Sequence, residues 1–317
     1  MHKTNFNSLQ HYLESQILGQ PNLVKQLLIA LLADGHILVE GPPGLAKTRA
    51  VKSLSDCVEG DFHRIQFTPD LLPADLTGTD IFRPETGEFT FQSGPIFNSL
   101  ILADEINRAP AKVQAALLEA MQEKQVTLGD ETLQLPSPFL VLATQNPVEQ
   151  EGTYPLPEAQ LDRFMLKLKL GYPSREEEMK ILERMAGSSN PASVNVILNL
   201  DDIKKAQQAV NGVFVDDRIR GYTVDLVNAT RFPAKNNCGD LEKFIENGAS
   251  VRASINLIKV AKAQSLLQGR TFVSPHDIKT LSHEVLRHRI SLSYEAEAQG
   301  KSTDDIIDEI LTRIKVP

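Results

Sequence analysis

Apolar residues in the first half of the chain follow two spacings. From residue 21 to residue 33 they recur every three or four positions, which predicts a helix that ends at Asp34-Gly35. Short strand-like runs follow, and the later ones are almost wholly apolar, as is typical of buried parallel strands. The predicted strands cover residues 36–40, 63–67, 99–103 and 139–143, and an amphipathic helix carries Val113, Ala116, Leu117, Ala120 and Met121 on one face.

Strands that alternate with helices through about residue 170 predict a parallel α/β sheet, which binds ligands beyond the carboxyl ends of its strands. Two inserts interrupt the alternation. Residues 80–92 contain a Pro84-Glu85-Thr86-Gly87 turn, and residues 125–135 contain Gly129-Asp130. Each segment is therefore predicted to be a hairpin around its turn. They either extend the sheet or form exposed loops that contact a partner protein.

Helical patterns predominate after residue 171 and predict a second domain. We expect an α/β core over residues 1–172 and a helical domain over residues 173–317. Ser274 followed by Pro275 predicts a helix start. The last helix carries an apolar stripe, which we interpret as core packing rather than a groove for a partner. The stripe consists of Ile306, Ile307, Ile310, Leu311 and Ile314.

Composition and charge narrow the class of protein. The 317 residues are 41% hydrophobic and 23% charged, which suits a folded globular chain of two domains and excludes disordered, collagenous and disulfide-framed proteins. The net charge of -8, from 33 basic and 41 acidic residues, has the wrong sign for a protein that coats phosphate backbones. A local basic groove is still compatible with this charge.

Several features predict a cytoplasmic protein. Cys57 and Cys238 stand alone without metal-ligand spacing, so neither a zinc site nor a disulfide framework is expected, and a reducing compartment fits best. The polar N-terminal segment has no apolar core of the kind secretory signals carry. No apolar run approaches the roughly 18 residues that cross a bilayer, so no membrane span is predicted.

The segment from residue 41 to residue 48 is the strongest candidate for chemistry. Glycines allow the backbone N–H groups to surround an anion, while the ammonium of Lys47 neutralises phosphate oxygens and the hydroxyl of Thr48 binds Mg²⁺. Ala46 stands where the strict pattern has glycine, and it is tolerable if its φ is negative. The candidate ATP-binding residues are Gly41, Pro42, Pro43, Gly44, Leu45, Ala46, Lys47, Thr48 and Arg49.

Asp104 and Glu105 follow the strand predicted at residues 99–103. The aspartate can hold Mg²⁺ through water, and the glutamate can polarise the water that attacks the γ-phosphate. Adjacent acids at a strand end are more often a solvated turn, but the phosphate-binding loop upstream favours the catalytic interpretation.

Three further residues have catalytic interpretations beside ordinary ones. Asn146 follows the next strand and is placed to orient the same water, or it forms a turn before Pro147. Arg163 is either a surface ion-pairing residue or an arginine finger that reaches the γ-phosphate of a neighbouring subunit. Arg252 begins a helix of the second domain and would reach the nucleotide from there.

In this order, the segments GPPGLAKT, LILADEINRAP, LATQNP, EAQLDRF and GASVRAS resemble the AAA+ ATPases, and specifically the MoxR family. The resemblance runs from residue 17 to at least residue 263. It implies a P-loop α/β core with hairpin inserts, followed by an all-α lid. The alanine at position 46 is itself typical of that family, whereas Val251 stands where many members carry proline.

The resemblance also implies roles for individual residues. Residues 80–92 correspond to the helix-2 insert, and residues 125–135 correspond to the hairpin before sensor 1. The implied site residues are Lys47, Thr48 and Asp104 as phosphate and magnesium ligands, Glu105 as catalytic base, Asn146 as sensor 1, Arg163 as arginine finger, Arg252 as sensor 2, and Ile17 and Leu18 at the adenine pocket.

The implied activity is hydrolysis of ATP with Mg²⁺ by a homo-oligomer, expected to be a hexameric ring. Such a ring would act like a chaperone that helps client proteins mature, assemble or receive metal cofactors, often beside a partner with a von Willebrand factor A domain. A helicase-like nucleic-acid motor is the alternative. The acidic net charge disfavours it, and so does the scarcity of basic residues in the hairpins, since the first hairpin has only Arg83. A nucleotide-binding scaffold that never hydrolyses ATP is a third possibility, which the presence of Glu105, Arg163 and Asn146 disfavours.

One apparent metal motif is rejected. His283 and His288 resemble a zinc-protease pair stretched by one residue. On an α-helix that spacing places the imidazoles about 140° apart, so they cannot share a metal.

Overall fold

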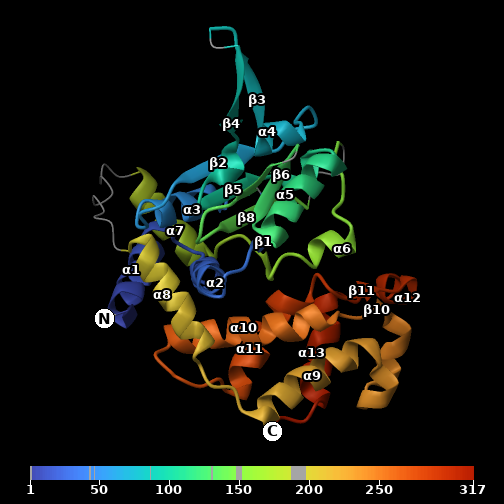
Figure 1. Cartoon of the computed structure of the whole chain (residues 1–317). Helices are drawn as coiled ribbons and strands as arrows, with labels where there is room; N and C mark the ends of the chain where they lie inside the picture. Colours follow the sequence, from blue (N-terminus) through green and yellow to red (C-terminus); the bar gives the residue numbers. More distant parts are fainter. Residues whose placement is uncertain are drawn as a thin grey trace. The chain divides into compact units, whose positions relative to one another are not determined.

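The computed structural model describes residues 2–42, 44–45, 47–85, 87–129, 131–147, 152–186 and 198–317 (Figure 1). The chain divides into two compact units. The first unit comprises Met1–Phe164 and Leu168–Lys204, and the second comprises Met165–Lys167 and Lys205–Pro317.

A five-stranded sheet forms the centre of the first unit. Its strands lie in the order β2-β5-β8-β1-β9, and the pairs β2–β5, β5–β8 and β8–β1 are parallel. This sheet confirms the predicted α/β class and the predicted strands, whose ends shift by one or two residues. The fifth strand, β9, was not predicted. The strands are β1 (Ile37–Glu40), β2 (Phe62–Gln66), β5 (Leu100–Asp104), β8 (Leu140–Gln145) and β9 (Leu166–Lys169).

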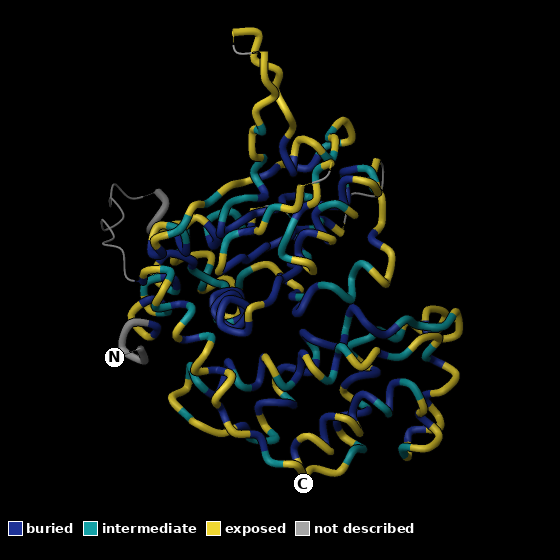
Figure 2. Tube along the Cα trace, viewed as in Figure 1, coloured by how far each residue is buried: buried dark blue, intermediate teal, exposed yellow. Residues whose placement is uncertain are grey.

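The helices of the first unit cover the sheet and share a buried core with it (Figures 1 and 2). The apolar face predicted at residues 113–121 is buried apart from Ala116, which is half-buried, because it shares a core with Ile101 and Val141 of the central strands. The helices are α1 (His2–Gln16), α2 (Pro21–Leu32), α3 (Lys47–Ser55), α4 (Pro73–Thr77), α5 (Ala111–Glu123), α6 (Glu158–Leu161) and α7 (Arg175–Ala186), with 3-10 turns at Pro95–Phe97 and Ile106–Arg108. Helix α8 (Leu200–Asn211) begins in the first unit and continues into the second.

Both predicted hairpins are present, and each forms a separate two-stranded sheet instead of extending the parallel one. The first consists of β3 (Gly78–Arg83) and β4 (Glu88–Ser93), and the second of β6 (Gln125–Leu128) and β7 (Glu131–Gln134). The β3–β4 hairpin projects away from the body of the α/β unit, and nearly all its residues are exposed (Figures 1 and 2).

The second unit is mainly helical, as predicted. The cap at Ser274 is confirmed, because Ser274 Oγ and N–H both bond the Asp277 carboxylate at distances of 2.7 and 2.8 Å. Four residues of the apolar stripe in the last helix are buried, which supports core packing. The helices are α9 (Asp217–Arg231), α10 (Val251–Leu267), α11 (Pro275–Leu286), α12 (Tyr294–Ala298) and α13 (Thr303–Arg313), with 3-10 turns at Pro233–Asn236 and Gly239–Phe244.

A short antiparallel pair in the second unit was not predicted. It consists of β10 (Ile245–Asn247) and β11 (Ser291–Leu292), which are too short to show a period-2 pattern. In the part of the chain that the structure describes, no helix has the length and apolar character needed to cross a membrane.

The first unit extends beyond residue 172, where the sequence analysis expected the lid to begin. Glu59 N–H donates to the carbonyl of Leu198 over 2.9 Å, and Val58 forms a bridge with Leu198. A Cβ on Gly19 would lie 3.1 Å from Cβ of Pro173 and 3.4 Å from Cβ of Glu177. Residues on both sides of α7 therefore pack on the α/β unit, and a functional boundary at residue 172 stays a prediction.

His36 links the sheet to α5 from a buried position. Its Nδ1 accepts the N–H of Val141 over 3.1 Å, and its Nε2 lies 3.1 Å from the carbonyl of Met121. A backbone N–H can only donate, so Nδ1 is unprotonated and Nε2–H donates to Met121. Burial lowers the pKa of His36 to about 4, although the hydrogen bond to Met121 works in the opposite direction.

This arrangement predicts a pH-dependent loss of stability. The unfolded His36 titrates at about pH 6.5, so its contribution is complete above that pH and is lost as the pH falls towards 4. Between pH 7 and pH 5 the loss from this one residue should be about 2 kcal/mol. Urea unfolding of wild type and His36→Gln at both pH values would measure it, with exposed His63→Gln as control. An equal loss in His36→Gln would contradict the assignment.

Candidate nucleotide site at the carboxyl edge of the sheet

The carboxyl ends of three neighbouring strands bring the predicted site residues together. β1 pairs with β8 so that Glu40 lies opposite Gln145, and Gly41 N–H donates to the carbonyl of Gln145 over 3.2 Å. On the other side of β8, β5 ends in Asp104. The loop after β1 and the acid pair after β5 therefore lie at one edge of the sheet, as the parallel topology predicts.

The two glycines of the loop meet backbone requirements. A Cβ on Gly41 would lie 2.9 Å from the carbonyl oxygen and 3.0 Å from Cβ of Leu170, which is too close for a side chain there. Gly44 has a φ of +84°, which side-chain-bearing residues rarely adopt. Leu45 is buried and Pro42 is half-buried. Pro43 and Ala46 lie outside the described residues, so the predicted φ of Ala46 stays a prediction.

Lys47 is the first residue of α3, and its side chain turns back over the loop. Nζ donates to the carbonyl of Gly41 over 2.8 Å. Burial lowers the pKa of Lys47, while the negative charges of Asp104 and Glu105 oppose that shift. Thr48 and Arg49 follow on α3, and both are half-buried. The lysine and the acid pair therefore share one electrostatic environment.

Asp104 is held from two sides. Its Oδ1 accepts a 2.6 Å hydrogen bond from the hydroxyl of Thr144, and its Oδ2 accepts from Arg64 Nη2 over 2.7 Å. The Thr144 hydroxyl also accepts the N–H of Glu105 over 2.9 Å, so one side chain of β8 positions both acids. The sequence analysis missed Thr144 and Arg64. Thr144 offered a signal, because it lies near the carboxyl end of a strand that neighbours the acid pair, whereas Arg64 lies in the middle of β2.

Glu105 occupies an uncommon backbone conformation. Its φ of 58° and ψ of 51° are left-handed, a region that is sparsely populated by residues with a side chain. Its Oε2 accepts from Gln66 Nε2 over 3.0 Å and forms an ion pair with Arg108 Nε at 3.2 Å. The turn and these contacts fix the direction of the carboxylate.

The remaining predicted residues lie at different places. Asn146 is buried one position after β8, and Arg163 is half-buried two positions after α6. Ile17 is buried and Leu18 half-buried immediately after α1. Arg252 is the second residue of α10, in the second unit, and its N–H donates to Ser250 Oγ over 3.2 Å. The roles of these residues stay predictions.

The donor set fits Mg²⁺. Asp104 and Thr48 offer a carboxylate and a hydroxyl, which are the hard oxygen ligands that Mg²⁺ takes beside phosphate oxygens and water. Within the described ranges, no group of three or more His, Cys, Asp and Glu side chains is arranged to hold a metal by itself. A site with few protein ligands is compatible with that finding.

His283, one of the two histidines of the rejected zinc-protease motif, pairs with Asp308 at 3.0 Å.

Comparison with protein families identifies the class. Residues 36–166 match the model of the ATPase family associated with various cellular activities (AAA), and residues 241–310 match the model of the AAA lid domain. These matches cover β1, β2, β5 and β8 with the loop after β1, and much of the helical unit. The fold and the site thus define an ATPase of the AAA class.

Individual relatives narrow the family. Over 301 residues the chain is 47% identical to chaperone MoxR1 of Mycobacterium tuberculosis, a match that covers 95% of this chain and 79% of that protein. It is 28% identical over 334 residues to protein MoxR of Paracoccus denitrificans, covering 98% and 96% of the two chains. A solved structure of a candidate ATPase from Cytophaga hutchinsonii superposes with a TM-score of 0.93 at 48% identity, covering 100% of this chain and 96% of that one. The chain belongs to the MoxR family of AAA+ ATPases, as the resemblance in sequence indicated.

The position of Lys47 predicts that its removal abolishes tight nucleotide binding. Lys47→Ala should weaken ATP affinity by at least about tenfold. The substitution removes a partly buried ammonium group that contacts the loop. Titration calorimetry would measure the affinity, and circular dichroism would verify folding. The matched control is Lys52→Ala, an exposed residue further along α3. Equal ATP binding by Lys47→Ala and wild type would refute the phosphate site.

Proposed function

We propose that the protein is an Mg²⁺-dependent ATPase that works as a homo-oligomeric ring and remodels client proteins in the manner of a chaperone. The observation that carries the proposal is the shared edge of the sheet on which Lys47, Asp104 and Glu105 converge, with both acids bonded to Thr144. Membership of the MoxR family supports ATP hydrolysis and a chaperone-like role in general.

The proposed chemistry converts ATP and water to ADP and phosphate. The N–H groups of the loop and the ammonium of Lys47 hold the phosphates, and Ile17 and Leu18 contact the adenine. Thr48 and Asp104 would hold Mg²⁺, which when bound withdraws negative charge from the phosphate oxygens. Glu105 accepts a proton from the attacking water.

Asn146 orients that water in this scheme, and its buried position just beyond β8 supports the assignment. The fixed direction of the Glu105 carboxylate supports a proton acceptor that needs little reorganisation.

Assembly completes the proposed site. We assign Arg163 as the arginine finger that a neighbouring subunit receives, so hydrolysis requires a ring, which family resemblance suggests is a hexamer. Arg252 would report the nucleotide state to the helical lid. Clients that mature, assemble or receive metal cofactors, and a partner with a von Willebrand factor A domain, are part of the same proposal. The two buried, unpaired cysteines suit a cytoplasmic location.

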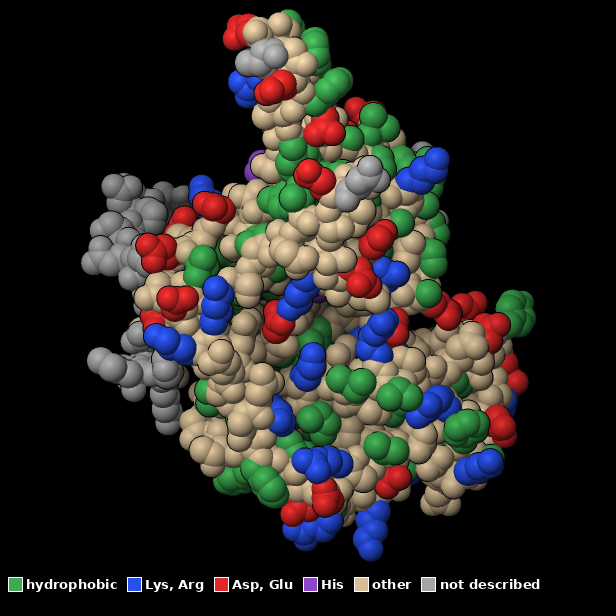
Figure 3. Space-filling view, in the orientation of Figure 1, with side chains coloured by type: hydrophobic (Ala, Val, Ile, Leu, Met, Phe, Trp, Pro, Cys, Tyr) green, Lys and Arg blue, Asp and Glu red, His purple; other side chains and the backbone are tan. Residues whose placement is uncertain are grey.

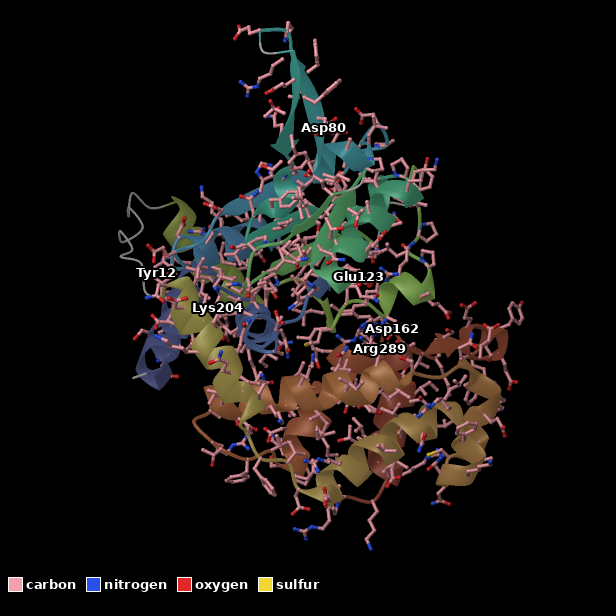
Figure 4. The ribbon with its side chains drawn as sticks, in the orientation of Figure 1. Tyr12, Asp80, Glu123, Asp162, Lys204 and Arg289 are labelled. Atoms are coloured by element: carbon pink, nitrogen blue, oxygen red, sulfur yellow. The ribbon has the colours of Figure 1, made fainter. Side chains whose placement is uncertain are left out.

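The β3–β4 hairpin is the proposed contact surface for clients. Phe82 and Phe89 are 50% and 71% exposed, and their rings contact each other at a tilt of 54° with centroids 5.2 Å apart. Acidic and apolar side chains gather over the same hairpin in Figure 3, and Figure 4 labels Asp80 on β3. Exposed aromatic rings beside acids suit a protein segment with apolar and basic residues, and the acidic side chains disfavour the nucleic-acid alternative because they repel phosphates.

Complementation between two inactive variants tests the shared site. Glu105→Gln should bind ATP but lose hydrolysis by about a hundredfold or more, and Arg163→Ala should lose assembly-dependent hydrolysis by a similar factor. A mixture should recover part of the activity, because one subunit supplies Glu105 and its neighbour supplies Arg163. Phosphate release measures turnover, and labelled subunits verify mixing. Absence of recovery in mixed oligomers would argue against a finger acting in trans.

A second experiment tests the client surface. Affinity capture from a lysate with the Glu105→Gln form and ATP should retain client proteins. A variant that also carries Phe82→Ser and Phe89→Ser should retain severalfold less. The hairpin is remote from the loop and the acids in sequence and forms its own sheet, so ATP affinity should remain within about twofold. Tyr294→Ser, at an exposed residue of the helical unit, is the matched control. Unchanged capture would exclude the hairpin as the contact.

A further inference from the structure

Arg64 on β2 reaches across the edge of the sheet to the proposed magnesium ligand. β2 and β5 pair in parallel register, with Arg64 opposite Leu102 and Gln66 opposite Asp104. The guanidinium of Arg64 donates twice to Oδ2 of Asp104, from Nη2 over 2.7 Å and from Nε over 3.2 Å. Nη2 also donates to Oε1 of Gln66 over 3.0 Å. The carboxylate of Asp104 therefore already has a cation beside it.

The two oxygens of Asp104 have different partners. Oδ1 bonds the hydroxyl of Thr144, and that hydroxyl is itself held by Glu105 N–H. This bond positions the acid without any need for Arg64. Oδ2 faces the guanidinium of Arg64. A Mg²⁺ ion that binds Oδ2 must therefore either displace the guanidinium or bind beside it.

Resting on the proposed function, we propose that Arg64 is a tethered cation that competes with Mg²⁺ for Asp104 and so sets the magnesium concentration at which the ATP-loaded site fills. Arg64 can lower the affinity for Mg²⁺ in two ways. If the guanidinium stays, its charge repels the incoming divalent cation; if it leaves, its ion pair with Asp104 must first break. Either way, Mg²⁺ binds more weakly than it would without Arg64.

Exposure makes this exchange reversible. The side chain of Arg64 is 49% exposed, whereas that of Asp104 is 12% exposed. A half-exposed arginine can move into water at small cost, because water solvates the charge that it removes from Asp104. The carboxylate of Asp104, by contrast, stays in place because the hydroxyl of Thr144 bonds its Oδ1. Arg64 therefore acts on the metal step through the carboxylate of Asp104 and contacts no reacting atom.

The test measures metal binding and not turnover. Mn²⁺, a spectroscopic substitute for Mg²⁺, would be titrated into full-length Glu105→Gln protein saturated with ATP, with electron paramagnetic resonance reporting bound metal. Arg64→Gln should lower the free Mn²⁺ concentration at half-occupancy by about two- to fivefold, the range that partly exposed charge pairs give. Arg64→Lys keeps the charge and should give a smaller change. Arg83→Gln, which removes an exposed arginine from the hairpin, should give none.

Two further measurements separate this role from others. ATP affinity in EDTA should be the same with and without Arg64, and Arg64→Gln should have no effect on Mn²⁺ binding in an Asp104→Asn background. Weaker or unchanged metal binding in Arg64→Gln would overturn the proposal, as would a loss of metal-free ATP affinity, which would make Arg64 a phosphate ligand. A wild-type protein that binds no ATP would overturn both this inference and the proposed function, whereas ATP binding with metal affinity indifferent to Arg64 would overturn this inference alone.

Discussion

The parallel register of β5, β8 and β1 is the constraint on which the site depends. It places the end of β5, the end of β8 and the loop after β1 at one edge, where a single hydroxyl, that of Thr144, bonds both Asp104 and Glu105. A shift of one residue between β5 and β8 would turn these side chains to opposite faces of the sheet. The buried core beneath the strands, which packs against α5, stabilises this register.

Charge at this edge is balanced before any ligand contributes. Lys47 approaches the acid pair from the start of α3 and Arg64 from β2, and Arg108 contacts Glu105 directly. Each acid thus has a cation and a neutral hydrogen-bond donor nearby, which lowers the free energy of holding two carboxylates side by side. ATP and a divalent cation bring opposite charges into the same network, so binding rearranges existing ion pairs instead of filling a neutral pocket. Such rearrangement is how a nucleotide can be sensed by residues that do not touch it.

The β3–β4 hairpin and the helical unit are built independently of the parallel sheet. The β3–β4 strands pair only with each other, so their exposed aromatic residues are available without disturbing the parallel sheet. In the helical unit, Asp277 is fully buried and is held by Arg270, Gln264 and Ser274. Burial alone would raise the pKa of Asp277, but these hydrogen bonds outweigh it and hold the pKa far below its usual value. These hydrogen bonds join the end of α10 to the start of α11 within the helical unit.

Sequence alone determined the class of fold, the phosphate-binding loop and the acid pair, because each depends on local patterns: apolar runs, glycines at fixed offsets and acids at a strand end. It also determined both hairpins, whose turns are encoded by adjacent residues. Only the tertiary structure revealed Arg64, Gln66 and Thr144, since their contacts with Asp104 and Glu105 join residues about 40 positions apart and depend on which strands are neighbours. It likewise showed why position 41 must be glycine: the approach of Leu170, brought close by the folded chain, leaves no room there for a side chain.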